Sequence, residues 1–296
     1  MVPQITIVLQ GPVDWNLVAT NGLPTTFYNI RKLRSLLPGC QIILSTWENE
    51  KTELLPVDKV IYNIDPGHQP SRIPDGIINN VNRQIVSTVA GLKSANHPYT
   101  LKMRTDIVLL GTNFLRAFAY AKPPAAYAAL FERKIISNNL TSRNPRAISD
   151  VPLPLHPSDH VHFGLTSDLL TFWDVPLQTD EDADYFLDRD RPNHFRDHET
   201  SRLIPEQHIC LNAFKKKFSV DLSHYSDSSQ IEWGEKLLLE NFAFIKDHDF
   251  PINFSKYHTP YHAQFEWLRY PKISKKALLR RRLKNIWLIR KICGLI

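Results

Sequence analysis

Apolar runs of strand length alternate with segments of helical spacing over residues 4–110, and this alternation limits the fold to one class. Their order along the chain is strand, helix, strand, strand, helix, strand. Such an order predicts a three-layer α/β domain, in which helices flank a mostly parallel central sheet. The predicted strands are 4–12, 41–48, 59–65 and 99–110, and the predicted helices are 24–39 and 79–95.

The last of these strands carries three charged residues, Lys102, Arg104 and Asp106, and the last two interrupt a largely apolar run. A carboxylate beside a core strand is destabilising unless it has a partner. Ligands of parallel sheets bind beyond the carboxyl ends of the strands, so we expect Asp106 to face a ligand crevice. A structural ion pair between Arg104 and Asp106 is the alternative, and the spacing does not choose between the two.

Phosphate and metal chemistry are the first candidates for such a crevice. The chain has neither a GxGxxG nor a GxxxxGK[ST] sequence, so dinucleotide-binding and P-loop folds lose their main support. Histidines four residues apart occur without an HExxH sequence, which argues against a zinc hydrolase. A hard cation such as Mg²⁺ or Mn²⁺ takes one or two carboxylates together with substrate phosphates, and Asp106 can supply one. Lys102 and Arg104, on the same face of the strand, can neutralise a diphosphate.

Four segments of the sequence, taken in order, resemble one known family. They are IVLQGPV, LPGCQIILSTWE, NNVNRQIVSTVAGLK and LKMRTDIVLL. Together they resemble the WavE family of lipopolysaccharide-synthesis proteins, and DHVHFG and PEQHI extend the resemblance more weakly. The resemblance implies a GT-A-like bacterial glycosyltransferase. Such enzymes have a single Rossmann-like domain, use a nucleotide-sugar donor, and usually bind a divalent metal through an Asp-x-Asp motif.

The metal motif implied by this resemblance is incomplete here. Arg104-Thr105-Asp106 stands where Asp-x-Asp is expected, so a guanidinium replaces one carboxylate. Either Asp106 alone anchors Mn²⁺ or Mg²⁺ through the donor diphosphate, or Arg104 replaces part of the charge of the metal. His258 in the segment KYHTPYH is the candidate for a further metal ligand. His262 is its rival, and a histidine packed among aromatic rings is the structural alternative.

The resemblance also implies where a nucleotide sugar would bind. The turn Gln10-Gly11-Pro12 would contact the base or ribose, because the Gln10 amide both donates and accepts and Gly11 permits close approach of the backbone. Helix N-termini favour anions, and Arg83 in the segment NNVNRQ can fork a phosphate or stack on a base. Trp47 either joins the site or belongs to the core. The predicted nucleotide-sugar-binding residues are Gln10, Gly11, Pro12, Trp47, Asn82, Arg83, Lys102, Arg104 and Asp106.

Glycosyl transfer with inversion needs a base that deprotonates the acceptor hydroxyl. In many GT-A enzymes this base is an acid that opens a helix after the acceptor-binding segment. Glu206 in IPEQHICLNAF holds that place, so we predict Glu206 as the catalytic base, with Asp159 in SDHVHFG as its rival. The structural alternative for Glu206 is a first-turn glutamate that only favours the helix dipole.

The basic residues are concentrated in the last part of the chain. Of 36 Lys and Arg residues, nine lie in residues 272–296, which contain no acid, and 27 face 30 acidic residues in the remainder. The tail mixes these charges with apolar residues, which predicts a basic amphipathic helix on an anionic membrane surface. A helix packed on the body with its basic face in water is the alternative. The mildly acidic body argues against nucleic-acid binding.

Cysteine usage and the start of the chain indicate a compartment. Three scattered cysteines form no CxxC pair, which is typical of a reducing environment. The first apolar run is too short for a signal peptide or a membrane span. We therefore expect a cytoplasmic protein, peripheral on the inner face of the bacterial cytoplasmic membrane.

Taken with the resemblance, these features predict a glycosyltransferase that moves a hexose from a nucleotide sugar, by preference a UDP-sugar, to a surface-polysaccharide or lipid-linked saccharide acceptor. We expect a domain over 1–272, with a nucleotide-sugar-binding half at 1–110 and an acceptor-binding half at 111–272, followed by the tail 273–296. A nucleotidyltransferase on a related α/β fold is one alternative, and pyrophosphate release would favour it. A non-catalytic scaffold of polysaccharide assembly is another, and a lack of affinity for nucleotide sugars would favour that.

Overall fold

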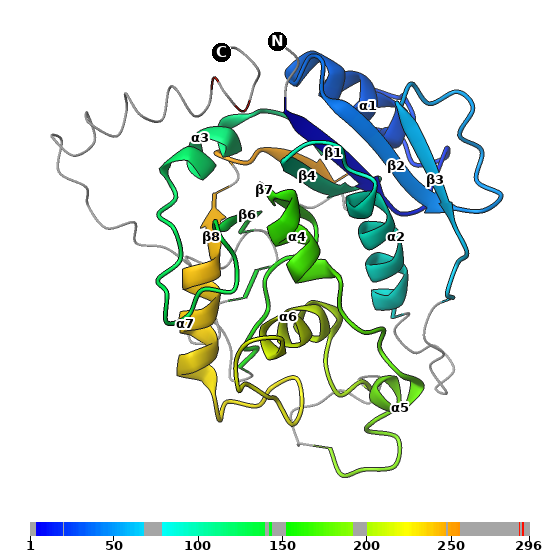
Figure 1. The fold of residues 1–296 in the computed structure, drawn as a ribbon. Coiled ribbons are helices and arrows are strands. Elements are labelled where there is room, and N and C mark those ends of the chain that lie inside the picture. The colour runs from blue at the N-terminus through cyan, green and yellow to red at the C-terminus, as the bar shows by residue number, and fades with distance from the viewer. Residues whose placement is uncertain are drawn as a thin grey trace, which may run out of the picture.

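A seven-stranded sheet forms the centre of the molecule. The computed structural model describes residues 4–19, 21–67, 79–139, 142–143, 152–191, 200–246, 248–254, 290 and 292. Across the sheet the strands follow the order β3-β2-β1-β4-β7-β6-β8 (Figure 1). They are β1 (Ile5–Gln10), β2 (Gln41–Trp47), β3 (Lys59–Asn63), β4 (Tyr99–Arg104), β6 (Ile135–Asn138), β7 (Val161–Leu165) and β8 (Phe242–Ile245).

Most of these strands run in the same direction. β3, β2, β1 and β4 pair in parallel, and so do β6 and β8. β7 is antiparallel to both of its neighbours, β4 and β6. Within this sheet β7 alone therefore opposes the others, and the predicted mostly parallel α/β sheet is confirmed.

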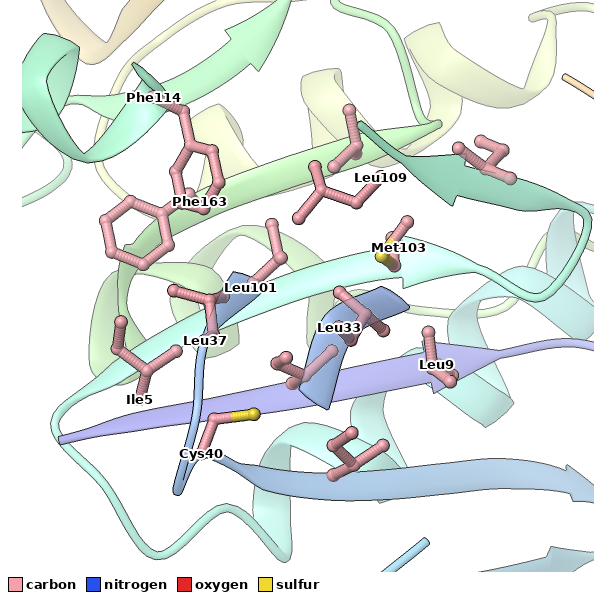
Figure 2. Close-up of a cluster of buried hydrophobic side chains, with 14 of the residues drawn as sticks. Ile5, Leu9, Leu33, Leu37, Cys40, Leu101, Met103, Leu109, Phe114 and Phe163 are labelled. Carbon is pink, nitrogen blue, oxygen red and sulfur yellow. The ribbon is translucent and has the colours of Figure 1, made fainter. Parts of the chain in front are cut away.

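Helices cover both faces of the sheet. α1 (Thr25–Leu36) and α3 (Asn113–Tyr120) contribute to one apolar core, part of which Figure 2 shows. The second core takes its residues from α2 (Val81–Lys93), α4 (Thr166–Trp173), α6 (Pro205–Lys215) and α7 (Ile231–Asn241). Along β1, Ile7 and Leu9 belong to the first core and Val8 to the second, as the alternation of side chains in a strand requires. The short helix α5 (Asp180–Ala183) completes the described helices.

The order in which the strands are added to the sheet reverses at β1, which makes this strand a topological switch point. β1 lies between β2 and β4 in the sheet, α1 follows β1 on one face, and α2 precedes β4 on the other. Open α/β sheets hold their ligands beyond the strand ends at such a point. The fold thus directs attention to the carboxyl ends of β1 and β4.

One predicted strand is wrong in its extent. Residues 99–110 were expected to form a single strand, but β4 ends at Arg104, and β5 (Ile107–Leu109) pairs antiparallel with β9 (Ile252–Phe254) in a separate two-stranded sheet. The break is held by contacts with distant segments. The Thr105 N–H donates to Gln10 O at 3.1 Å, and Thr105 Oγ1 donates to Pro12 O at 2.6 Å. Asp106 therefore lies in a turn between two sheets.

The end of the chain returns to the body at one described residue. Ile292 is fully buried in the core that includes β1, and its carbonyl oxygen accepts the Gln4 N–H at 3.0 Å. The predicted tail helix otherwise falls outside the described residues, which include only 290 and 292 of this part of the chain. Within the described part of the chain, no helix is both long enough and apolar enough to cross a membrane.

Candidate functional site

A cleft opens beyond the carboxyl ends of β1, β2 and β4. Its volume, about 680 Å³, is typical of ligand sites. Seven residues predicted to bind a nucleotide sugar line it, and they come from segments far apart in the sequence. They are Gln10, Gly11, Pro12, Trp47, Arg83, Arg104 and Asp106. The cleft is completed by Asp14, Leu17, Thr26, Asp65, Asn80, Gln84 and Thr105.

The turn after β1 brings the backbone close to the neighbouring strand. Gly11 has φ +115°, and a Cβ at this position would lie 3.2 Å from Thr105 Oγ1. A side chain here would therefore be strained and crowded, which explains the glycine. Gln10, beside it, is 3% exposed, and Ser87 Oγ of α2 donates a hydrogen bond to Gln10 Oε1 at 2.9 Å. The turn thus presents a fixed amide to the cleft.

Arg104 and Asp106 form a bidentate pair on the wall of the cleft. Arg104 Nε donates to Asp106 Oδ1 at 2.9 Å, and Nη2 donates to Oδ2 at 2.6 Å. The two side chains are 20% and 16% exposed, so water screens this pair only in part. The sequence left two alternatives for this pair, a structural ion pair or an Asp106 that faces a crevice. The two residues form an ion pair and also line the cleft.

Arg83 supplies the second guanidinium of the cleft and is fixed in the same way. Its Nε and Nη2 donate to the two carboxylate oxygens of Asp65 at 2.7 and 2.6 Å, and Nη1 donates to Asn80 Oδ1 at 3.0 Å. Asp65 was not among the predicted site residues, although it is the last residue of the predicted strand 59–65, which is the signal that could have found it. Two arginines with fixed side chains suit an anionic ligand.

Asn82 and Lys102 do not line the cleft. Asn82 exchanges two hydrogen bonds with the backbone of Gln178, at 3.0 and 2.8 Å, and so joins α2 to that segment. Lys102 is fully buried, donates to the carbonyl oxygen of Asp159, and lies with Nζ 4.1 Å from the ring centroid of Trp173. Burial lowers the pKa of Lys102 to about 7. Asn82 and Lys102 thus contact other parts of the protein and do not reach the lining of the cleft.

Asp159, the rival candidate for the base, is a buried acid among basic side chains. Its Oδ1 lies 3.4 Å from His160 Nε2, and its Oδ2 lies 3.9 Å from Arg104 Nη1. Burial disfavours the carboxylate, but His160, Arg104 and Lys102 outweigh burial and hold the pKa of Asp159 well below its usual range. A carboxylate with such a low pKa accepts a proton poorly.

Glu206 has the opposite electrostatic character. It lies in the first turn of α6, directly after Pro205, and its Oε2 is 3.8 Å from His156 Nε2. Burial, and then the nearby negative charge of Asp159, raise the pKa of Glu206 to about 8. Two neighbouring acids with pKa values displaced in opposite directions are typical of acid–base chemistry.

The two parts of the site meet at Arg104. Glu206 and Asp159 do not line the 680 Å³ cleft, but Arg104 lines it and approaches Asp159. The charges of Asp159 and Arg104 both act on Glu206. Arg104 therefore links the lining of the cleft to the acid pair, because it lines the one and lies 3.9 Å from an acid of the other.

The described residues do not assemble a site for a divalent metal. Among them, no group of three or more His, Cys, Asp or Glu side chains could hold an ion. Both oxygens of Asp106 accept from Arg104, and His258 lies outside the described residues. The metal implied by the sequence resemblance thus has no fitting ligand set in this part of the chain.

The fold and the cleft define an α/β protein with a candidate ligand site at a switch point of its sheet. The family profile described as WavE lipopolysaccharide synthesis matches residues 5–286, and the chain belongs to the WavE family. This match confirms the resemblance seen in the sequence. No curated protein matches the chain.

Several solved structures have partial similarity to this one. HddC from Yersinia pseudotuberculosis is 12% identical, with 63% of this chain and 86% of that chain covered and a TM-score of 0.33. The 4-diphosphocytidyl-2C-methyl-D-erythritol synthase from Anaerococcus prevotii DSM 20548 is 13% identical, at 72% and 98% coverage and a TM-score of 0.33. The nucleoside-diphosphate-sugar pyrophosphorylase from Vibrio cholerae RC9 is 8% identical, at 88% and 98% coverage and a TM-score of 0.37. Scores this low support no inference about activity.

Proposed function

We propose that this chain is a glycosyltransferase of lipopolysaccharide synthesis, which moves a hexose from a nucleotide sugar to a saccharide acceptor. One observation carries the proposal: two fixed arginines line the cleft, and the charge of one of them, Arg104, acts on Glu206, an acid whose pKa is raised to about 8. Membership of the WavE family gives the biosynthetic setting.

The donor would occupy the cleft at the switch point. Its diphosphate would lie against the guanidinium groups of Arg83 and Arg104, which match phosphate oxygens in planar geometry. The nucleoside would contact the Gln10 amide and the backbone at Gly11, where the absence of a side chain permits close approach. Trp47, which is 7% exposed and lines the cleft, offers a ring for the base or ribose.

Glu206 is the better candidate for the base. A general base works best when its pKa lies near the working pH. Burial raises the pKa of Glu206 to about 8, whereas the basic groups around Asp159 hold the pKa of Asp159 well below its usual range. In the proposed step the Glu206 carboxylate takes the proton of the acceptor hydroxyl. That oxygen bonds to the anomeric carbon, the bond from this carbon to the diphosphate oxygen breaks, and the nucleoside diphosphate leaves with inversion.

Product analysis tests the proposal. The purified protein would be incubated with a panel of nucleotide sugars and lipopolysaccharide-derived oligosaccharides, with detection of nucleoside diphosphate and of oligosaccharides one hexose heavier. We expect both products together, and Glu206→Gln to lose both. Formation of a nucleotide sugar and pyrophosphate from a nucleoside triphosphate and a sugar phosphate would assign a nucleotidyltransferase instead. Absence of affinity for every nucleotide sugar would leave a scaffold.

A further inference from the structure

We propose that Arg104 supplies the positive charge that holds the donor diphosphate, and that diphosphate binding in this cleft needs no divalent cation. The inference rests on the proposed function, because it concerns the same donor. It departs from the metal-dependent binding that the Asp-x-Asp resemblance implies.

The first reason is the state of Asp106. Its two oxygens accept from the two arms of one guanidinium, at 2.9 and 2.6 Å. A divalent cation at this carboxylate would lie beside a permanent positive charge. The side chains of the pair are only 20% and 16% exposed, so the repulsion would be weakly screened. Asp106 is therefore a counter-ion of Arg104 and a poor metal ligand.

The second reason is that the described part of the cleft offers Asp106 no further metal ligands. A hard cation in a protein takes several oxygen ligands. The other carboxylates of the cleft wall are engaged as well: Asp65 accepts from Arg83 through both oxygens, and Asp14 Oδ1 accepts the backbone N–H groups of Asn16 and Leu17. In the described ranges no set of three metal-ligating side chains occurs.

The third reason is the position of Arg104. It is the last residue of β4 and pairs in register with Gln10, the last residue of β1. Arg104 thus lies at the switch point, where its side chain lines the cleft together with Gly11. A phosphate offers the same two-oxygen geometry as a carboxylate. The diphosphate can therefore replace Asp106 as the partner of this fork, while Asp159, 3.9 Å from Nη1, keeps a second negative charge nearby.

Titration calorimetry with nucleoside diphosphates tests the inference without requiring catalysis. UDP, GDP, CDP, ADP and dTDP would be titrated into the full chain, once in EDTA and once in Mn²⁺. We expect the Kd of the tightest binder to be the same in both buffers. Arg104→Gln should weaken binding at least about tenfold, because a charge-assisted bidentate contact is lost.

Asp106→Asn separates the two readings most sharply. If Asp106 is only the counter-ion of Arg104, the variant releases the fork and should bind the nucleoside diphosphate as tightly as the wild type or more tightly. If Asp106 anchors a metal, the variant should lose binding. Arg34→Gln is the matched control. Arg34 forms an ion pair with Asp58, in which Nη2 and Oδ1 are 2.8 Å apart, and neither residue lines the cleft.

The outcomes distinguish this inference from the function on which it rests. Binding that appears only in Mn²⁺, together with its loss in Asp106→Asn, overturns the inference and leaves the glycosyltransferase intact. Absence of binding of all five nucleotides in either buffer overturns the proposed function and the inference with it. The comparison of buffers and the Asp106→Asn variant both decide the question even if Arg104→Gln fails to fold.

Discussion

Glu206 is the residue on which the proposed chemistry depends most. Replacing it with glutamine keeps the size of the side chain and removes the proton acceptor. We expect Glu206→Gln to lower kcat by about 10²–10⁴ and to leave the Kd of the nucleoside diphosphate unchanged. The wild-type rate should rise with pH up to about 8, because the base acts when deprotonated. Steady-state kinetics across this pH range check both.

Asp159→Asn gives the contrasting result. The negative charge of Asp159 helps to raise the pKa of Glu206, so its removal should shift the rising limb of the pH–rate profile to lower pH. The limb itself should remain. If instead the limb disappears in Asp159→Asn and Glu206→Gln is mild, Asp159 is the base and the assignment is reversed.

The same carboxyl makes stability depend on pH. Glu206 has a higher pKa in the folded chain than its ordinary 4.5, so the folded state holds the proton more tightly than the unfolded state does. Its contribution is fully present below pH 4.5 and is lost as the pH rises towards 8. Glu206→Gln should therefore raise Tm relative to the wild type more at pH 8 than at pH 4. An equal difference at both pH values would show that Glu206 titrates normally.

At the scale of helices and strands, the first 110 residues could be predicted well. The apolar runs became β1, β2 and β3, and the two helical segments became α1 and α2, because both periodicities report local geometry and burial together. The break after Arg104 could not be predicted. It depends on hydrogen bonds from Thr105 to Gln10 and Pro12, which lie more than ninety residues away in sequence.

The second half shows the same limit. The helix that Glu206 was expected to open is α6. β6 and the antiparallel position of β7 between β4 and β6 were not predicted. Strand neighbours are chosen by packing across the whole sheet, and a short buried run such as IISN has no local signal for its partner.

Gly91 tests how α2 positions the cleft. This glycine lies in the helix where it crosses the sheet, and a Cβ would overlap Val8 Cγ1 and lie 3.3 Å from Ser45 Cβ. Gly91→Ala should destabilise the chain by about 1–3 kcal/mol, since overpacking exceeds the gain in helix propensity. It should also weaken nucleoside diphosphate binding, because Arg83 is on the same helix. Thermal unfolding and calorimetry measure the two effects.

Lys93→Ala is the control for that experiment. Lys93 is an exposed residue of the same helix, and its ion pair with Asp174 at 3.3 Å lies at the surface, where such pairs contribute little. We expect nearly unchanged stability and binding. A Gly91→Ala variant as stable as Lys93→Ala would mean that α2 can move away from β1 without cost.

At the scale of the whole molecule, the candidate site was partly accessible from sequence. Residues at strand ends and at the start of α2 supplied seven of the fourteen residues that line the cleft, since parallel strands bring their carboxyl ends to one edge. The burial of Lys102 was not accessible, because it depends on Trp173 and on the carbonyl of Asp159, both from the second half of the chain. Nor could the sequence show that Arg104 already binds both oxygens of Asp106.

The basic tail is the remaining feature of the whole chain that bears on the proposed acceptor. Ile292 is buried in the core beside β1 and accepts a hydrogen bond from Gln4, so its backbone is fixed to the body at this point. Arg290, two residues earlier, is exposed. If the proposed acceptor is carried on a lipid, binding of the basic tail to the membrane would keep the chain close to that acceptor. Truncation at residue 272 would remove a core residue, so substitutions are the better test.

We expect the full chain to sediment with vesicles that contain anionic lipid, and less so as salt is raised. Arg280, Arg281 and Arg282 lie in the basic part of the tail. Each basic side chain near an anionic surface contributes roughly 1 kcal/mol, so changing all three to glutamine should weaken vesicle binding by about a hundredfold. Ile292 would stay in place. The matched control replaces three exposed cations of the body, Arg31, Lys51 and Lys59, and should bind as the wild type does. Failure of the wild-type chain to bind anionic vesicles at low salt would mean that the basic face of the tail is simply exposed to water.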